Sequence, residues 1–357
     1  MKFRIFLVVG VAALLAACGS VGNPRADMCT EPTDQPIVDT ALASSIRSTL
    51  GITSGPTCAD LENLTNEAAL IAARNNKQII SWADVNEALD RITLGLRRGS
   101  LVPTEEERRN LAYHESGHAV AYAAQPVLGD IRKVTIMPRG GAGGFMAPLS
   151  KEEMFYDVER FRSQLRVAFA GRVAEKKITG TISSGASNDL KQATEMAKQM
   201  VLDLGMGNRE YVAWGSDQGP IFLGGEISRR KDFSEETARE LEEEVSEILR
   251  SSYLETEELL EQNWVTVEAV AEALLERETI DGKLIHQAHQ MALEGKSVAE
   301  IKEWIVASAE ASERRIQELE EREKQAVQER EKQAAEHGRH GPLEPRPEPR
   351  PAGESGD

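Results

Sequence analysis

His114-Glu115-Ser116-Gly117-His118 is the most informative stretch of this chain. Two histidines four residues apart lie on one face of a helix, close enough for both imidazoles to bind a single Zn²⁺. The glutamate beside the first histidine can then reach a water molecule at the open position of the metal. The chain holds only six histidines in 357 residues, so the pattern H-E-x-x-H arises by chance about once in a hundred such chains. The stretch therefore predicts a zinc site.

The residues on either side of this motif predict a long helix. Thr104 to Glu107 has the form of a capping box, and Pro126 ends the element. Apolar and motif residues recur at steps of three and four, so they share one stripe of the helix. The residues of this stripe are Leu111, His114, Glu115, His118, Ala119 and Tyr122. We expect the stripe to face the interior, where two histidines and a glutamate without a metal would lack partners. Gly117 lowers helix propensity, and a close approach by another backbone would explain it.

Composition limits the classes of protein to which the chain can belong. Its length suffices for one large domain or two modest ones. A formal net charge of −17 argues against a nucleic-acid partner, because binding phosphates requires clustered Lys and Arg. Few aromatic residues and many Ala, Glu, Leu and Arg favour a mainly α fold, to which the strands described below add a minor α+β part.

The first residues have the features of a targeting segment. Lys2 and Arg4 precede an apolar run, Ile5 to Ala17, that is too short to span about 30 Å of hydrocarbon. We therefore expect residues 1–17 to be a signal peptide. The run ends in a box that resembles the cleavage site of bacterial lipoproteins, which predicts lipidation of Cys18 and a membrane-anchored chain on the extracytoplasmic, periplasmic side. The alternative to cleavage is an uncleaved anchor, and the alternative location is the cytoplasmic face of the inner membrane.

Residues 18–50 are rich in Pro, Thr and Asp and are expected to form a tether. Outside the cytoplasm, Cys29 and Cys58 could form a disulfide. Closing a loop of that length would stabilise the fold by about 3–4 kcal/mol in the chain-entropy model. The alternative, that Cys58 is a small residue at a helix start, stays open.

Periodicity predicts several further elements. Residues 60–76 and a segment capped by Ser81 form helices, whereas residues 130–149 form a strand, a Gly-rich loop and a short edge strand that contains Pro148. Ser150 and Ser187 are expected to cap the next two helices, which end near residues 177 and 205. Helices follow from 234 to 263 and from 265 to 276. Ile92 and Leu204 are expected to face inward, and the helix capped by Ser150 is expected to run through Phe155 and Val158.

The C-terminal region is strongly charged. Between residues 310 and 336 most side chains are Glu, Lys, Arg or Gln, and apolar positions are too sparse for sustained heptads. A solvated helix is therefore favoured over a coiled coil. We expect a charged helical extension over 286–340 and a disordered Pro-rich tail over 341–357.

A catalytic zinc site needs a third protein ligand. A metzincin would have a histidine six residues after His118, but Ala124 stands there. Asp189 is a candidate, since it lies in the first turn of a predicted helix, where the partial positive charge favours a carboxylate. Taken alone, an aspartate at such a position is more often a capping residue.

Several stretches resemble the peptidase domain of FtsH-type membrane proteases. They are Ala112–Ala119, Val134–Gly140, Gly171–Glu175, Thr181–Asp189, Gln192–Thr194, Met200, Gly205–Met206, Phe222–Gly224 and Glu278–Gly282. Upstream, Gly55–Arg97 resembles the helical lid of the family's AAA+ ATPase module. The resemblance runs in the family's order and with its spacing.

This resemblance implies a lid-like helical remnant at 51–100 and a zincin-like, mainly helical zinc peptidase domain at 101–285. It also implies that Asp189 is the third zinc ligand. Family members carry an ATPase core with a G-x-x-x-x-G-K-[ST] loop, which does not occur in these 357 residues. We therefore expect no ATP site in this chain.

The resemblance further implies a zinc metalloendopeptidase. Its zinc would activate a water molecule, with Glu115 as general base, and the edge strand at Gly144, Phe145 and Met146 would pair with an extended substrate. Without an ATPase, substrates would be unfolded, damaged or delivered proteins. The resemblance also implies a homo-oligomer, a hexamer in the family. The alternative is a non-catalytic, lipid-anchored scaffold or an assembly subunit of an FtsH-like complex.

Overall fold

The computed structural model describes residues 58–77, 80–97, 103–150, 155–208, 212–214 and 234–337. The predicted signal peptide, Cys18, Cys29, the tether and the tail lie outside these ranges, as does the side chain of Cys58. The chain separates into two units, Met1–Glu310 and Ala311–Asp357. In the part of the chain that is described, no helix has both the length and the apolar character needed to cross a membrane.

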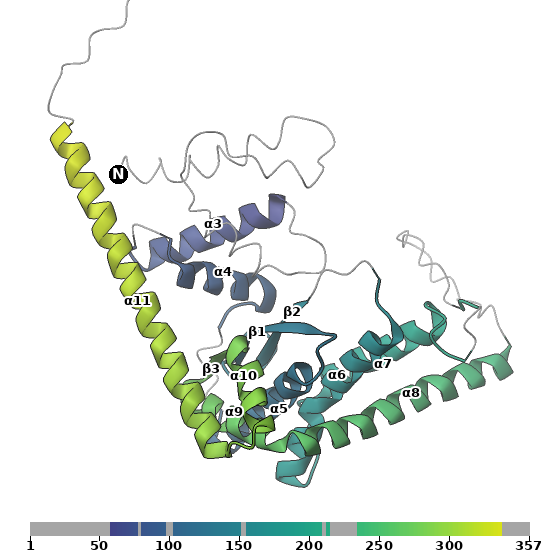
Figure 1. The fold of residues 1–357 in the computed structure, drawn as a ribbon. Coiled ribbons are helices and arrows are strands. Elements are labelled where there is room, and N and C mark those ends of the chain that lie inside the picture. Colours follow the sequence, from purple (N-terminus) through teal and green to yellow (C-terminus); the bar gives the residue numbers. More distant parts are fainter. Residues whose placement is uncertain are drawn as a thin grey trace, which may run out of the picture. The chain divides into compact units, whose positions relative to one another are not determined.

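Helices dominate the described residues, whose three strands form one small sheet (Figure 1). This confirms the predicted mainly α class with a minor β part. The elements in chain order are α3 (Cys58–Arg74), α4 (Trp82–Leu94), α5 (Glu105–Ala123), β1 (Gly129–Thr135), β2 (Phe145–Ser150), α6 (Val158–Thr179), α7 (Ser187–Leu202), α8 (Glu235–Gln262), α9 (Trp264–Arg277), β3 (Thr279–Asp281), α10 (Gly282–Leu293) and α11 (Val298–His337).

Helix α5 carries the H-E-x-x-H motif through the centre of the first unit. Its start confirms the predicted capping box, because the Thr104 hydroxyl accepts from the Glu107 N–H and the Glu107 carboxylate accepts from the Thr104 N–H. The prediction of a single inward stripe was too narrow. All residues from Ala112 to Ala123 are buried, since α6, α9 and the sheet cover the helix from several sides.

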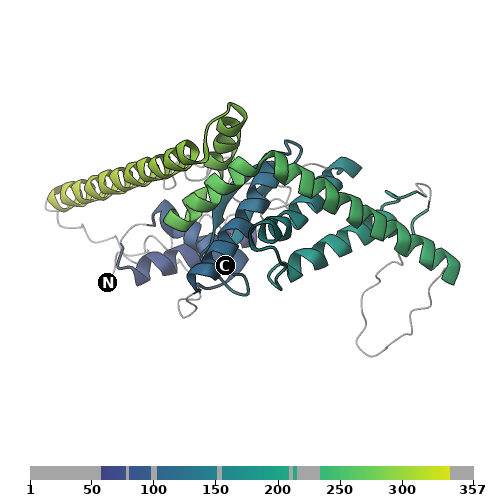
Figure 2. The same ribbon diagram turned by 90° about the horizontal axis from the view of Figure 1, so that it is seen from below.

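The close approach predicted at Gly117 is confirmed. A Cβ atom at Gly117 would lie 2.6 Å from the carbonyl oxygen of Ala170 and 2.9 Å from Cβ of Ala174. Both belong to α6, so the two helices cross at a distance that only glycine allows. Helix α8 packs in turn along α6 and α7, as the view from below shows (Figure 2).

The sheet has the order β2-β1-β3, with both pairs antiparallel. Strand β2 lies at the edge, as predicted, and its Pro148 stands opposite Ile131, next to a shift in register before Lys133. Strand β3 was not predicted, because three residues are too few to show a period. Its Ile280 pairs with Val134 and is fully buried.

The predicted cap at Ser150 is wrong. Ser150 is the last residue of β2, and α6 begins at Val158, where the Asp157 carboxylate accepts from the Arg160 N–H. The later start leaves Phe155 84 % exposed, and Val158, in the first turn of α6, is 37 % exposed. The predicted cap at Ser187 is wrong by one residue, since Ala186 is the N-cap of α7.

Two further apolar residues that were expected to face inward are exposed. Ile92 lies on α4, which packs against α3, and the core of this two-helix hairpin is closed by other residues, among them Val85, Ala88 and Leu89. A pair of helices covers only a narrow stripe on each partner, which leaves Ile92 outside it. Leu204 lies beyond the end of α7 and therefore off its buried stripe.

The hydrophobic core of the first unit continues past residue 285, where we expected the peptidase domain to end. Ala288 of α10 and Ile301 and Ile305 of α11 are fully buried in the same core as α5. The first turns of α11 thus belong to the core. In the second unit, Ile316 and Leu319 are exposed, in agreement with a solvated charged helix.

Candidate metal centre

The three predicted ligands come together from two helices. Nε2 of His114 and Nε2 of His118, one turn apart on α5, lie 3.0 Å from each other. Oδ2 of Asp189, in the first turn of α7, lies 3.4 Å from the first nitrogen and 3.5 Å from the second. These three atoms form a compact triangle.

The outer nitrogen of each imidazole faces an acceptor on α6. His118 Nδ1 lies 2.7 Å from the carbonyl oxygen of Val167, which can only accept, so the proton of this ring belongs on Nδ1. His114 Nδ1 lies 2.9 Å from Oε1 of Glu175, although the contact is bent and leaves Nδ1 without an aligned hydrogen bond. The Glu175 carboxylate accepts a second contact from the Ser183 hydroxyl. Both rings therefore direct the lone pairs of Nε2 toward Asp189.

This arrangement fits Zn²⁺. Two imidazole nitrogens and a carboxylate oxygen are typical zinc ligands, and a tetrahedral site with Zn–N near 2.05 Å separates its ligand atoms by about 3.3 Å. The observed separations of 3.0, 3.4 and 3.5 Å lie around that value. Three acceptors facing one point in a buried site are unfavourable unless a cation lies between them. His114, His118 and Asp189 thus have the chemistry and spacing of a zinc ligand set.

The electrostatics of the site favour positive charge. Burial lowers the pKa of His114, but the carboxylates of Asp189 and Glu175 outweigh it and raise that pKa to about 10. Burial raises the pKa of Asp189, yet the two imidazoles hold it well below its usual range. Burial also raises the pKa of Glu175, and contacts with His114 and Ser183 outweigh this and lower it. The ligands and Glu175 therefore stabilise a cation among them.

Glu115 lies on the side of α5 that faces the sheet, and it is almost completely buried. A Cβ atom at Gly144 would lie 2.7 Å from Glu115 Oε1 and 2.8 Å from the carbonyl oxygen of Thr135. The backbone just before β2 therefore lies against the Glu115 carboxylate. Burial raises the pKa of Glu115, although the neighbouring imidazoles lower it in part. A carboxylate in this environment takes up a proton more readily than an exposed one.

Two residues to which we assigned no individual role from the sequence also shape the site. Gly171 of α6 lies against both rings, since a Cβ atom there would be 2.5 Å from His118 Nε2 and 2.6 Å from His114 Cε1. Glu175, one turn further along α6, contacts His114. Their i, i+4 spacing within a stretch already linked to the family was the available signal.

The predicted substrate strand lies next to Glu115. Gly144 is buried, whereas Phe145 and Met146 are half-buried and pair with Thr135 and Val134 of β1. The structure places Gly144 against Glu115, and Phe145 and Met146 on the edge strand of the sheet. Their role toward a substrate stays a prediction, as do the lipidation of Cys18 and the pairing of Cys29 with Cys58.

Comparison with known proteins agrees with this geometry. Residues 101–288 match the model of peptidase family M41. The ATP-dependent zinc metalloprotease FtsH 2 of Salinibacter ruber is 40 % identical over 247 residues, which are 69 % of this chain and 36 % of that protein. The ATP-dependent zinc metalloprotease FtsH of Acidobacterium capsulatum is 40 % identical over 251 residues, which are 70 % of this chain and 39 % of that protein.

A third relative, the ATP-dependent zinc metalloprotease FtsH 2 of Petrotoga mobilis, is 37 % identical over 274 residues, which are 76 % of this chain and 43 % of that protein. The chain thus spans less than half the length of each of these relatives. The family model covers more than half of the chain and includes His114, His118, Asp189 and Glu115. The chain therefore belongs to peptidase family M41, the zinc metalloproteases of the FtsH type.

Proposed function

We propose that this chain is a zinc metalloendopeptidase that hydrolyses peptide bonds of unfolded or delivered proteins. The observation that carries this proposal is the convergence of His114 Nε2, His118 Nε2 and Asp189 Oδ2 close to the buried carboxylate of Glu115. A non-catalytic scaffold would have no need to keep three ligand atoms in this triangle. The geometry therefore favours the enzyme over the scaffold.

Each residue has a definite role in this proposal. His114, His118 and Asp189 hold the zinc, and Val167 and Glu175 fix the orientation of the two rings. When bound, zinc lowers the pKa of a water molecule and polarises a carbonyl group. Glu115 takes a proton from the attacking water on its carboxylate and passes it to the leaving nitrogen of the cleaved bond. The raised pKa of Glu115 suits this exchange.

Strand β2 is the proposed binding edge for the substrate. An extended polypeptide can add to the edge of a sheet through main-chain hydrogen bonds. Gly144 lies against Glu115, so a chain that pairs near Phe145 and Met146 would pass close to the general base. Main-chain pairing contributes little discrimination between side chains, so we expect a loose sequence preference.

We further propose that cleavage of unfolded proteins by these 357 residues requires no ATP. The relatives named above are ATP-dependent and longer, whereas the present sequence contains no G-x-x-x-x-G-K-[ST] loop. An unfolded substrate can reach an edge strand without prior unfolding by a motor.

Cleavage of casein tests both proposals. We expect zinc-loaded wild-type chain to cleave casein equally with and without ATP. The Glu115→Gln variant should bind the same amount of zinc and lose cleavage, because the amide cannot accept the proton. Undiminished cleavage by Glu115→Gln would refute the assignment of the base, and a strict requirement for ATP would refute the second proposal.

Location and assembly are also proposed. The apolar run up to Ala17 and the box at Cys18 support a lipidated, membrane-anchored chain outside the cytoplasm. Mass spectrometry of the mature N-terminus should find a lipid on Cys18, and an unmodified Met1 would contradict this. The family resemblance supports a homo-oligomer with the six-fold ring of the family, which mass photometry would detect as a species six times the mass of the chain.

A further inference from the structure

We propose that the α3–α4 hairpin is a positioning element for the peptidase centre. It would act through Arg139 on the loop 139–144, which places Gly144 against Glu115 and leads into β2. This inference rests on the proposed function, since it assigns the hairpin a role in that same site. Its evidence is a set of contacts between α4, the loop and α5.

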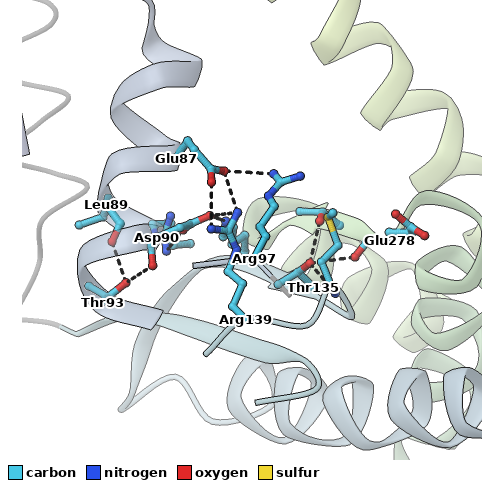
Figure 3. Close-up of polar contacts among 12 residues, drawn as sticks. Glu87, Leu89, Asp90, Thr93, Arg97, Thr135, Arg139 and Glu278 are labelled. Carbon is cyan, nitrogen blue, oxygen red and sulfur yellow. Dashed lines mark hydrogen bonds and ion pairs between the residues drawn. The ribbon is translucent and has the colours of Figure 1, made fainter. Parts of the chain in front are cut away.

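The first contact is made by a buried ionic cluster, in which carboxylates of α4 pair with cationic side chains of β1 and the loop. The Asp90 side chain, 3 % exposed, accepts from Arg132 at 2.9 Å, contacts Lys133, and lies 3.4 Å from Arg139. One turn earlier, the Glu87 carboxylate accepts from both terminal nitrogens of Arg139, at 3.1 and 2.7 Å. Figure 3 shows Glu87 and Asp90 directed at Arg139. The Arg139 guanidinium is thus held by two carboxylates of the hairpin in a buried site.

The second contact joins the main chains. The Gly140 N–H donates to the carbonyl oxygen of Leu96 at 3.0 Å, and Arg97 and Arg139 form an isolated antiparallel bridge. Gly140 has φ +52°, and a Cβ atom there would overlap the carbonyl oxygen of Leu94. The loop and the end of α4 therefore meet backbone to backbone, at a place where only glycine fits.

Only a few residues of the loop separate this contact from the peptidase centre. Arg139 and Ala142 exchange two main-chain hydrogen bonds, at 3.0 and 2.9 Å, which closes the turn. Beyond the turn, Gly143 lies against the Leu111 side chain, and Gly144 lies against Glu115. A shift of Arg139 would therefore displace the residues that touch the general base and precede β2.

The hairpin is well suited to act as one body. It has its own hydrophobic core, formed by Leu64, Ala68, Ile71, Val85, Ala88 and Leu89. Its two helices are also joined by an ion pair between Glu67 and Arg91. Glu67 and Glu87 are glutamates of the same hairpin with similar exposure, 24 % and 30 %. Glu67 pairs with Arg91, whereas Glu87 pairs with Arg139 and also with Arg97. Only Glu87 reaches the loop, so the pair provides a variant and its control.

The test compares Glu87→Gln with Glu67→Gln in the full chain. We expect Glu87→Gln to lower kcat/KM for casein by about tenfold, since a small misplacement of a positioned group already reduces rates strongly. The rise in KM should exceed the fall in kcat, because the loop determines where β2 begins. Bound zinc should not change. Glu67→Gln should leave both constants within about twofold of wild type, because its partner lies inside the hairpin.

Hydrogen exchange supplies a readout that does not depend on activity. We expect the amides of residues 140–146 to exchange about tenfold faster in Glu87→Gln than in wild type or Glu67→Gln, since their opening energy falls. Amides in the buried half of α5 should not change. Asp90→Asn should enhance the effect, and if it fails to fold, Glu87→Gln still decides the question.

The outcomes separate this inference from the proposed function. An inactive wild-type chain would refute the proposed function, while exchange would still show whether the hairpin holds the loop. Unchanged exchange and unchanged KM in a folded Glu87→Gln chain that cleaves casein would overturn the positioning role and leave the peptidase assignment intact.

Discussion

Two buried ionic clusters in the described part of the chain differ in how their charge is balanced. In the metal centre, three acceptor atoms of His114, His118 and Asp189 converge, and no Lys or Arg among the described residues is paired with them. In the cluster on α4, the Asp90 carboxylate lies among Arg132, Lys133 and Arg139. The first cluster is completed by a cation from outside the chain, whereas the second is complete by itself.

The pKa values of the two clusters reflect the same difference in charge balance. In the metal centre, the pKa of His114 is raised to about 10, because two carboxylates outweigh the effect of burial. In the cluster on α4, burial raises the pKa of Asp90, but its cationic neighbours outweigh this and lower it. The pKa of Lys133 is lowered too, since burial exceeds the effect of Asp90. The Asp90 carboxylate stays charged in this cluster, because it has two arginine neighbours besides the lysine. A buried cluster whose charges are not balanced within the chain thus indicates ligand binding, and a cluster whose charges are balanced indicates a structural role.

Filling the space beside the imidazoles should abolish zinc binding by the first cluster. In Gly171→Ala, the added methyl group would lie 2.5 Å from His118 Nε2. We expect zinc binding and casein cleavage to be lost, as measured by metal analysis and gel assay. Gly141→Ala is the matched control for zinc binding, since a Cβ atom there meets nothing within 4 Å. A Gly171→Ala chain with a full equivalent of zinc would contradict the site geometry.

Removing the carboxylate of the second cluster should reduce stability and not metal binding. Asp90→Ala leaves buried cations without their partner, which typically lowers the free energy of unfolding by about 3–5 kcal/mol. Urea unfolding of the zinc-loaded chain would measure this. A loss below about 1 kcal/mol would mean that the cluster behaves like an exposed ion pair.

Altering the residue that orients His114 should weaken the first cluster in part. Glu175→Gln keeps the size of the side chain but removes the charge beside His114 Nδ1. Such changes around a metal site typically lower affinity by about 10–100-fold. Competition with a chelator would measure the zinc affinity. The same affinity as wild type would show that Val167 and Asp189 suffice to orient the rings.

The smallest effect is expected at an exposed ion pair on the neighbouring helices. Glu257 contacts Lys176 at 2.8 Å, but the two side chains are 37 % and 49 % exposed. Glu257→Gln should change the free energy of unfolding by less than about 1 kcal/mol and leave zinc affinity unchanged. If urea unfolding showed a larger loss of unfolding free energy, burial would not be what makes one ion pair of this chain more stabilising than another.

Much of the helical fold could be predicted because local signals agree with the tertiary structure. The capping box at Thr104 predicted the start of α5 correctly, whereas the predicted end at Pro126 lies three residues beyond the last residue of the helix, Ala123. Ser150 failed as a cap because strand pairing continues through it and Asp157 offers a later start. The three residues of β3 form a strand only because β1 lies beside them.

The metal centre could be predicted only in part. The spacing of His114 and His118 is local, so one helix suffices to predict their convergence. Asp189 comes from a different helix, and its own neighbourhood resembles an ordinary cap; only the family resemblance pointed to it. Gly171 and Glu175 act across the contact between α5 and α6, which no single stretch of sequence reveals.

Zinc K-edge X-ray absorption on the purified chain tests the central claim most directly. We predict one zinc per chain, bound by two imidazole nitrogens and carboxylate or water oxygens at about 2.0–2.2 Å. In Asp189→Ala, the signal of bound zinc should fall sharply, while casein cleavage disappears. Sulfur ligands at about 2.3 Å, or an unchanged zinc environment in Asp189→Ala, would contradict the account.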